Sequence, residues 1–153
     1  MAIELSTAGI LVKYAAETTA GTRPTTGYTT IPGIKSIPEI NPEPNMLQVT
    51  PLSEEEYHRY IPGLKDLGGA IGLTANFYSD FTDAWETCVA AFETAKAAGK
   101  GMWFEIMIPD DESFFIPGIP SSLGFGGAEV DAVLETVAYI TPNGAPVWAA
   151  HSS

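Results

Sequence analysis

Residues 70–108, AIGLTANFYSDFTDAWETCVAAFETAKAAGKGMWFEIMI, carry the pattern that decides the fold. Apolar and polar side chains alternate at the start of this stretch, which predicts a strand over 70–78. The pattern then becomes helical, because apolar residues recur at spacings of three and four. This apolar stripe consists of Phe81, Trp85, Cys88, Phe92 and Ala95. A second strand is expected over 101–108, so the stretch predicts two strands joined by a helix of about residues 80–98.

Both ends of this helix carry ordinary helix signals. Asp80 is expected to cap the first turn, and the charge of Asp83 favours the positive end of the helix dipole. Gly99 is expected to end the helix in a left-handed conformation. The helix therefore has an apolar face that should cover one side of a sheet.

The rest of the chain contains further strand candidates and no second helix. They lie at 9–14, 29–40, 46–51, 113–126 and 129–140. Many strands with a single helix are typical of an antiparallel β-sandwich or barrel. The expected fold class is therefore mainly β with one α-helix, in an antiparallel sandwich or barrel.

One domain is expected from the length of 153 residues. We divide it into an N-terminal strand with a flexible arm (1–28), a β-sandwich (29–144) and a C-terminal tail (145–153). The start of the chain lacks a basic region followed by an apolar core, so no signal peptide is expected. No apolar run reaches the roughly 20 residues of a membrane span, and no membrane insertion is predicted.

A long connection at 51–69 interrupts the strands. It is too long and too apolar for a free connection, because disordered segments are poor in aromatic and branched side chains. Its apolar side chains are Leu52, Tyr57, Tyr60, Ile61, Leu64 and Leu67. We expect this loop to become ordered by packing against another copy of the protein, with these residues as the contacts.

The charge of the chain bears on its partners. The formal net charge is −12, from 19 acidic and 7 basic residues. Such a chain does not grip nucleic acid, because that requires Lys and Arg on the phosphates. The net charge does not exclude a negative surface along which nucleic acid passes without specific binding.

No catalytic, metal-binding or cofactor-binding motif is present in the sequence. The single Cys88 excludes an intrachain disulfide and is expected in the core. His58 and His151 have no partner at metal-ligand spacing. The acidic clusters at 54–56 and 110–112 lack the spacing of a calcium loop and are expected to be solvated turns. We expect no enzyme activity, no metal and no cofactor.

Acidic residues also lie on the predicted strands. Glu129, Asp131 and Glu135 fall on one face of the strand expected at 129–140, and Glu105 lies on the strand at 101–108. In a monomer this face is an ordinary solvated surface. In a ring it could line a channel, so these four residues are candidates for a lumen.

From about residue 29 to 141 the chain resembles the tail tube proteins (major tail proteins) of long-tailed bacteriophages. The resemblance rests on the strands at 34–40 and 46–50, the segment Tyr60-Ile61-Pro62-Gly63-Leu64-Lys65-Asp66 and the strand at 72–78. It continues through the helix, the strand with Trp103-Phe104-Glu105-Ile106, the hairpin at 108–116 and the segment 118–140.

This resemblance implies a structural virion protein. Members of that family form hexameric rings of β-sandwiches, and the rings stack into a tube that carries DNA into the host. Partners would be further copies of the chain and other tail proteins, such as tape-measure and terminator proteins. Assembly would take place in the host cytoplasm, and the finished protein would lie in the phage tail.

The sequence is also compatible with two other classes of function. A carbohydrate- or ligand-binding sandwich would use Trp103, Trp85 and Tyr139 for stacking, although the helical stripe places Trp85 in the core. A small hydrolase would use two acidic side chains such as Glu105 and Glu135, without any supporting motif.

Overall fold

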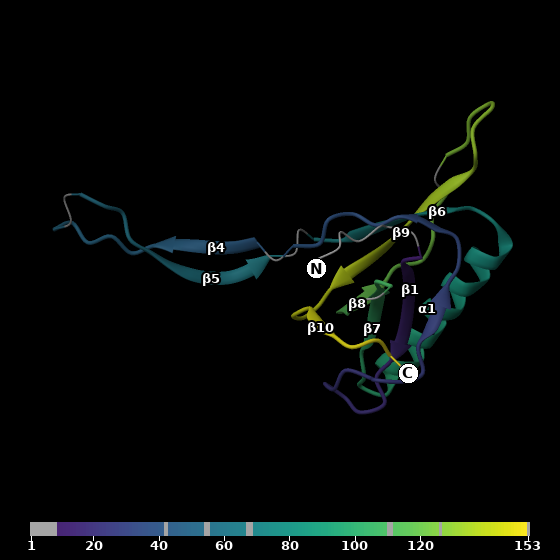
Figure 1. The fold of residues 1–153 in the computed structure, drawn as a ribbon, viewed down its shortest axis with the longest axis horizontal. Helices are drawn as coiled ribbons and strands as arrows, with labels where there is room; N and C mark the ends of the chain where they lie inside the picture. Colours follow the sequence, from purple (N-terminus) through teal and green to yellow (C-terminus); the bar gives the residue numbers. More distant parts are fainter. Residues whose placement is uncertain are drawn as a thin grey trace, which may run out of the picture.

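A computed structural model describes residues 9–41, 43–53, 56–66, 69–109, 112–125 and 127–152. Within these ranges it describes all side chains except those of 43–45 and 61–66. Figure 1 shows a body of strands with the helix along one side, and a long hairpin that extends away from the body.

The described part of the chain forms one helix and ten strands, which pair antiparallel. In chain order they are β1 Leu11–Ala16, β2 Thr29–Ile31, β3 Ile34–Ser36, β4 Glu43–Gln48, β5 Tyr60–Asp66, β6 Ile71–Asn76, α1 Ser79–Ala97, β7 Met102–Met107, β8 Ser113–Pro120, β9 Glu135–Pro142 and β10 Val147–Ala149. The predicted fold class, mainly β with one helix in an antiparallel sandwich or barrel, is confirmed.

The main sheet is curled into two layers. Its strand order is β2-β1-β7-β8-β9-β6-β3, with β10 added on β8. The two end strands, β2 and β3, follow each other in the chain with only Pro32 and Gly33 between them. The sheet must therefore fold over to bring both ends to one place. We call β2, β1, β7, β8 and β10 the first layer, and β9, β6 and β3 the second layer.

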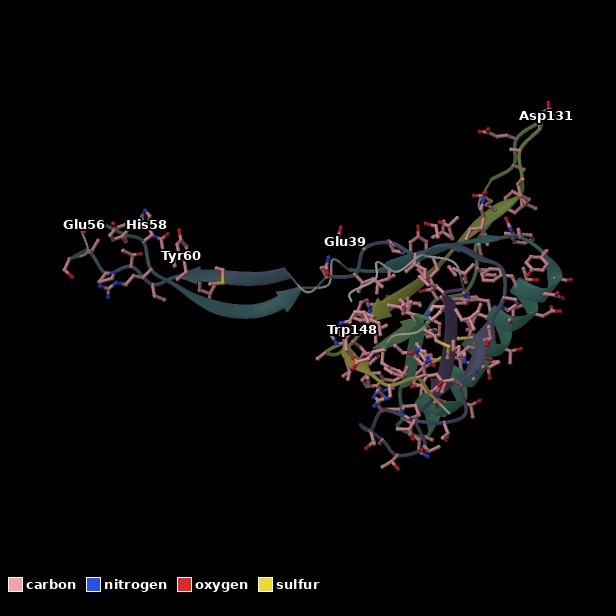
Figure 2. The ribbon with its side chains drawn as sticks, viewed as in Figure 1. Glu39, Glu56, His58, Tyr60, Asp131 and Trp148 are labelled. Atoms are coloured by element: carbon pink, nitrogen blue, oxygen red, sulfur yellow. The ribbon has the colours of Figure 1, made fainter. Side chains whose placement is uncertain are left out.

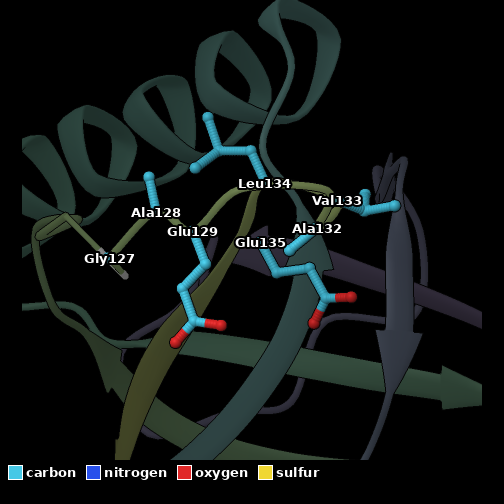
Figure 3. A pocket seen from close by; sticks show the side chains of 7 residues that line it. All are labelled: Gly127, Ala128, Glu129, Ala132, Val133, Leu134 and Glu135. Atoms are coloured by element: carbon cyan, nitrogen blue, oxygen red, sulfur yellow. The ribbon is translucent and has the colours of Figure 1, made fainter.

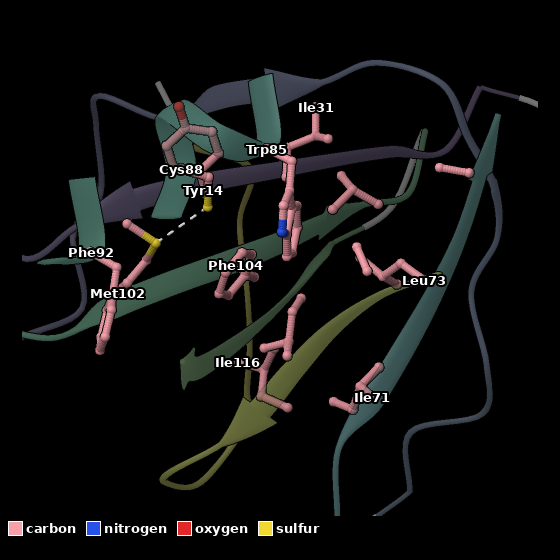
Figure 4. Close-up of a cluster of buried hydrophobic side chains, with 14 of the residues drawn as sticks. Tyr14, Ile31, Ile71, Leu73, Trp85, Cys88, Phe92, Met102, Phe104 and Ile116 are labelled. Carbon is pink, nitrogen blue, oxygen red and sulfur yellow. Dashed lines mark hydrogen bonds between the residues drawn. The ribbon is translucent and has the colours of Figure 1, made fainter. Parts of the chain in front are cut away.

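The core lies between these layers and under the helix (Figure 4). The register places Tyr14, Phe104 and Ile116 side by side on the inner face of the first layer. On the second layer Leu73 faces the core beside Ala138. In β6 and β9 every second residue is buried, as expected for a sheet with one covered face. In β8, by contrast, residues 113–116 are all buried.

The predicted helix of about 80–98 is confirmed as α1, and its whole apolar stripe is buried. The Trp85 ring stacks between those of Phe81 and Phe104, with centroid separations of 6.3 and 6.4 Å. The indole Nε1 of Trp85 donates to the carbonyl of Ser121 over 2.8 Å. Burial and this bond together fix α1 against the sheet.

One end of α1 differs from the prediction. Tyr78, not Asp80, is the N-cap residue, and no side chain caps the helix. The backbone N–H of Thr82 already bonds to the carbonyl of Tyr78, so the helix starts earlier and Asp80 lies inside its first turn. The predicted stop at Gly99 is correct, because its φ is 73° and its N–H donates to Lys96.

Strands β9 and β10 form a corner between the two layers. Pro142 of β9 pairs with Gly118 of β8, and Val147 of β10 pairs with Phe115 of the same strand. The two strands therefore follow one edge of β8 in succession. The segment between them is held to β8 by the N–H of Asn143, which donates to Pro117 over 3.1 Å. Strands that change sheets through such an irregularity are how sandwiches turn corners.

Two strand predictions are wrong in part. The strand expected over 129–140 begins only at Glu135, because residues 129–133 pair with none of the described strands, and alternation alone supplies no hydrogen-bond partner. The strand expected at 9–14 within a flexible N-terminal segment is β1. It lies inside the main sheet, between β2 and β7. Segments 1–28 and 145–153 thus each contribute a strand to the main sheet, while the division at those boundaries stays a prediction.

Candidate assembly surfaces

Strands β4 and β5 form a hairpin that stands apart from the main sheet. Among the described strands they pair only with each other, with Gln48 opposite Tyr60. The ladder continues past the strands, because the N–H of Val49 donates to the carbonyl of Arg59 over 2.9 Å. We call the described residues 43–53 and 56–66 the hairpin arm. Figure 1 shows it projecting well beyond the body.

The hairpin arm corrects the predicted loop at 51–69. Residues 60–66 of that loop are strand β5, so the connection is shorter than expected. Proline made this strand hard to foresee, since proline cannot donate to a ladder. Both strands of the arm have an open outer edge, however, and Pro62 lies on such an edge strand. The position is therefore tolerated.

Local hydrogen bonds organise the tip of the arm. The N–H of Arg59 donates to the hydroxyl of Thr50 over 2.6 Å, and the Gln48 amide nitrogen lies 2.7 Å from His58 Nδ1. The His58 ring also lies beside that of Tyr60, with centroids 6.5 Å apart. His58 therefore has a structural role in the tip, through its contacts with Gln48 and Tyr60.

The arm exposes large apolar side chains. Leu52 is fully exposed, Tyr57 is 75% exposed and Tyr60 is about half exposed. Met46, Leu47 and Val49 are exposed as well. Of the other predicted contact residues, Ile61 and Leu64 lie in β5 but their side chains are outside the description, and Leu67 lies outside the described residues. An isolated two-stranded hairpin is only marginally stable in water.

A second apolar projection lies in the connection between β8 and β9. We call its described residues, 121–125 and 127–134, the distal loop. Phe125, Val130 and Val133 are 72%, 91% and 71% exposed. The loop encloses a hollow of about 340 Å³ between Gly127 and Glu135 (Figure 3). Figure 2 shows Asp131 of the distal loop and Tyr60 of the hairpin arm at opposite ends of the molecule.

The acidic lumen candidates do not share one strand face. Glu129 and Asp131 are exposed but lie in the distal loop, not on a strand. Glu135 opens β9 and forms an ion pair with Lys35 of β3. Glu105 corrects the prediction most clearly, because it is fully buried. The expectation of a wet face fails there because other parts of the chain cover that side of β7.

The covers on the outer face of the first layer come from both ends of the described chain. The Arg23 guanidinium lies 4.3 Å from the centroid of the Phe115 ring, and the Tyr28 ring packs edge-on against the same ring. Ser152 donates to Glu105 from its hydroxyl and from its N–H. Register places Glu105 and Phe115 side by side, so one row of the sheet lies beneath both covers.

These contacts decide the ionisation of Glu105. Burial alone raises the pKa of its carboxyl group, but the hydroxyls of Ser113 and Ser152, the Ser152 N–H and the charge of Lys13 outweigh it and lower the pKa. Glu105 is therefore a carboxylate at neutral pH. Nearby, burial together with the Glu105 charge raises the pKa of Tyr28 to about 12, against the opposing charge of Arg23.

The outer face of the second layer has a different character. Gly72, Thr74 and Asn76 of β6 alternate with buried residues and lie opposite Tyr139, Val137 and Glu135 of β9. A Cβ on Gly72 would lie 3.2 Å from the ring of Tyr139, so this half-exposed ring lies over the glycine. The face is mostly neutral and polar, and its charged members Glu135 and Lys35 pair with each other.

Neither alternative function receives a site from the structure. Trp85 is in the core, Trp103 donates its Nε1 to Glu17 over 3.1 Å, and Tyr139 lies on the second layer. These three rings therefore form no common stacking platform. The two carboxylates of the hydrolase hypothesis, Glu105 and Glu135, lie on different layers, and Glu105 is closed off by Ser152.

Metal and thiol chemistry also find no support. Among the described residues, no three His, Cys, Asp or Glu side chains are grouped so that they could hold a metal ion. Burial raises the pKa of Cys88 to about 12, so this thiol stays protonated in the core as predicted. In the described part of the chain, no helix has both the length and the apolar character to cross a membrane.

The fold and its exposed surfaces define a β-sandwich with one flanking helix and two apolar projections at opposite ends. No model of a protein family matches the sequence, and no curated protein matches it. Solved structures do match. One is a chain of the six-fold symmetrised anti-feeding prophage baseplate, with a TM-score of 0.66, 9% identity, and 98% of each chain covered.

Two further matches are chains of gene transfer agent particles. The tail of the empty particle, with C6 symmetry, gives a TM-score of 0.63 at 16% identity, and the native virion gives 0.61 at 16%. Both cover 96% of this chain and all of the other. The chain therefore has the fold of subunits found in tail and baseplate structures, which confirms the predicted resemblance at the level of the fold.

Proposed function

We propose that this protein is a structural subunit that assembles into six-membered rings, and that the rings stack into the tube of a phage-type tail. The observation that carries the proposal is the hairpin arm, which projects from the body with exposed apolar side chains and, among the described strands, forms a two-stranded sheet of its own. The shared fold with chains of tail and baseplate structures supports the same conclusion.

The proposal assigns the hairpin arm to contacts between copies. Leu52, Tyr57 and Tyr60 would be buried against a neighbouring subunit, together with Ile61, Leu64 and Leu67. Covering apolar area of this kind is the main driving force for association. Other tail proteins, such as tape-measure and terminator proteins, would bind the finished tube in the virion after assembly in the host cytoplasm.

We assign the channel wall to the outer face of β6 and β9. The outer face of the first layer is covered by Arg23, Tyr28 and Ser152. On the second layer the described residues provide no such cover, and Tyr139 is half exposed there. Glu135 is then the lumen residue on a strand, while Glu129 and Asp131 would lie at its margin. A wall of neutral side chains with a self-paired Glu135 and Lys35 would hold no phosphate tightly, so DNA could pass.

Assembly is tested on the purified full chain. We expect rings or tubes in negative-stain images and a fast-sedimenting species in the centrifuge. The double substitution Leu52→Ser and Tyr57→Ser should leave a monomer whose melting temperature is unchanged, because neither side chain packs on the body. Ser53→Ala, at a neighbouring exposed position, is the matched control and should assemble. A wild-type chain that stays monomeric at high concentration in every salt condition would overturn the proposal.

The channel wall is tested with introduced thiols. In assembled tubes, Asn76→Cys should react with a small maleimide but not with a bulky polymer-linked one, while the free subunit reacts with both. Asp83→Cys on the exposed side of α1 is the control and should react with both reagents in tubes. Equal reaction of the two variants with the bulky reagent would place β6 on the outside and refute this assignment.

A further inference from the structure

A ring needs two different contact surfaces on each copy. In cyclic assemblies of more than two subunits, one patch of a subunit meets a different patch of the next. The hairpin arm supplies one such patch under the proposed function, on which the following inference rests. The second patch has to be sought elsewhere on the molecule.

Among the described residues outside the hairpin arm, the distal loop holds the most exposed large apolar side chains. Val130, Phe125 and Val133 are each more than 70% exposed, whereas Trp148, the next in order, is 56% exposed. Exposed apolar patches of this kind are typical of contact sites. The loop is also anchored, since the Phe125 ring packs edge-on against Phe77 at a centroid distance of 6.4 Å.

The positions of these two projections are complementary for a head-to-tail contact. Tyr60 and His58 lie at one end of the long axis, and Asp131 lies at the other end (Figure 2). A neighbour placed at the end from which the arm projects, in a similar orientation, presents its own distal end to that arm. The helix side of the neighbour offers a second hollow there, of about 340 Å³, between Val89 of α1 and Leu123.

We propose that the distal loop of one copy is the receiving surface for the hairpin arm of the next copy. Leu52 and Tyr57 of the arm would pack against Val130 and Val133 and towards the hollow beside Leu123. At every interface of a ring, the hairpin arm of one copy would contact the distal loop of the next copy, and no two hairpin arms would contact each other. The two apolar projections would thus cover each other.

Disulfide trapping in tubes assembled from cysteine variants of the chain tests this contact. A chain carrying both Leu52→Cys and Val130→Cys should give a ladder of covalent multimers on mild oxidation, because each copy links to the next. Leu52→Cys alone should give none. A chain with Leu52→Cys and Thr19→Cys, where Thr19 is an exposed turn residue in the body, is the control and should also give none.

Loss of apolar area provides a second readout. Val130→Ser with Val133→Ser should raise the concentration needed for half-assembly at least about tenfold, because each buried side chain contributes more than the free energy of one tenfold step. This variant keeps an intact hairpin arm, and the variant with Leu52→Ser and Tyr57→Ser keeps an intact distal loop. A mixture of the two should therefore give dimers and nothing larger, because each pair of chains can form one intact interface.

The outcomes separate this inference from the proposed function. Wild-type chains that form no ring refute the proposed function. If rings form, but the Val130 and Val133 substitutions leave assembly unchanged and no ladder appears, the receiving surface lies elsewhere and the inference is wrong. A covalent dimer from Leu52→Cys alone would show hairpins meeting each other and would overturn it equally.

Discussion

Ser152 donates its backbone N–H to the buried carboxylate of Glu105, with 3.1 Å between nitrogen and oxygen, and its hydroxyl bonds to the other carboxylate oxygen. These residues are 47 positions apart in the chain. The bonds hold residues 150–152 across the outer face of the first layer. A buried charge requires such partners, because leaving it without hydrogen bonds is costly.

Replacing Glu105 should therefore weaken the fold. Glu105→Gln keeps the shape but removes the charge that both Ser152 groups bond to, and hydrogen bonds to charged groups contribute roughly 1.5–3 kcal/mol. We expect the free energy of unfolding at neutral pH to fall by about that amount, measured by urea denaturation. Glu129→Gln, at an exposed position in the distal loop, is the matched control and should change it by less than about 0.5 kcal/mol. Equal effects of the two would refute the role of Glu105.

The same group gives a pH dependence with a definite sign. Folding lowers the pKa of Glu105 from its ordinary value of 4.5, so the unfolded chain binds the proton at higher pH than the folded one. The stabilisation by Glu105 is therefore complete above the pKa that this group has in the unfolded chain. It is lost as the pH falls through the lower pKa that the group has in the folded chain. The stability gap between wild type and Glu105→Gln should be constant near neutral pH and shrink below about pH 4.5. A gap that widens on acidification would contradict the assigned ionisation.

The corner between the layers should resist any added side chain. A Cβ on Gly118 would lie only 2.5 Å from Ile140 Cγ2, and overpacking of this kind costs roughly 1–3 kcal/mol. Gly118→Ala should lower the free energy of unfolding by about that amount. Gly124→Ala is the control, because a Cβ there meets no atom within 4 Å. Thermal unfolding of both variants measures this effect. If Gly118→Ala left the free energy of unfolding unchanged, β8 and β9 would separate readily to make room for the methyl group.

Salt should promote assembly. The chain carries a net charge of −12, and acidic residues flank both proposed contact surfaces, with Glu56 on the arm and Asp131 on the distal loop. Salt screens this repulsion over about 10 Å at 0.1 M, while the apolar contacts remain. Sedimentation should show a larger assembled fraction when salt is raised from about 0.05 to 0.5 M. Dissociation on adding salt would instead indicate an interface dominated by ion pairs.

Sequence periodicity predicted the centre of this fold well. The stripe from Phe81 to Ala95 became α1, and alternation from Ile71 to Asn76 became β6, because each pattern coincides with burial on one face. The strand predicted from Glu129 failed at its start for the opposite reason. The residues do alternate, but within the described part of the chain no strand pairs with residues 129–133 to complete a ladder.

The exposed apolar surfaces were predictable only in part. Composition predicted that Leu52, Tyr57 and Tyr60 contact another copy of the chain. These side chains are exposed, and the contact itself stays a prediction. The burial of Glu105 was out of reach, because its covers come from Arg23, Tyr28 and Ser152, all remote in sequence. The distal loop was missed since Val130 and Val133 were assigned to a strand.

The separation of the hairpin arm from the main sheet has a consequence for hydrogen exchange and for sequence drift. Amide protons of β4 and β5 are protected only by each other, so in the free subunit they should exchange long before those of β7 or β8. The arm can also accept substitutions without disturbing the core beneath α1. A lineage of such chains could therefore acquire a new neighbour through changes in residues 43–66 while the rest of the protein folds as before.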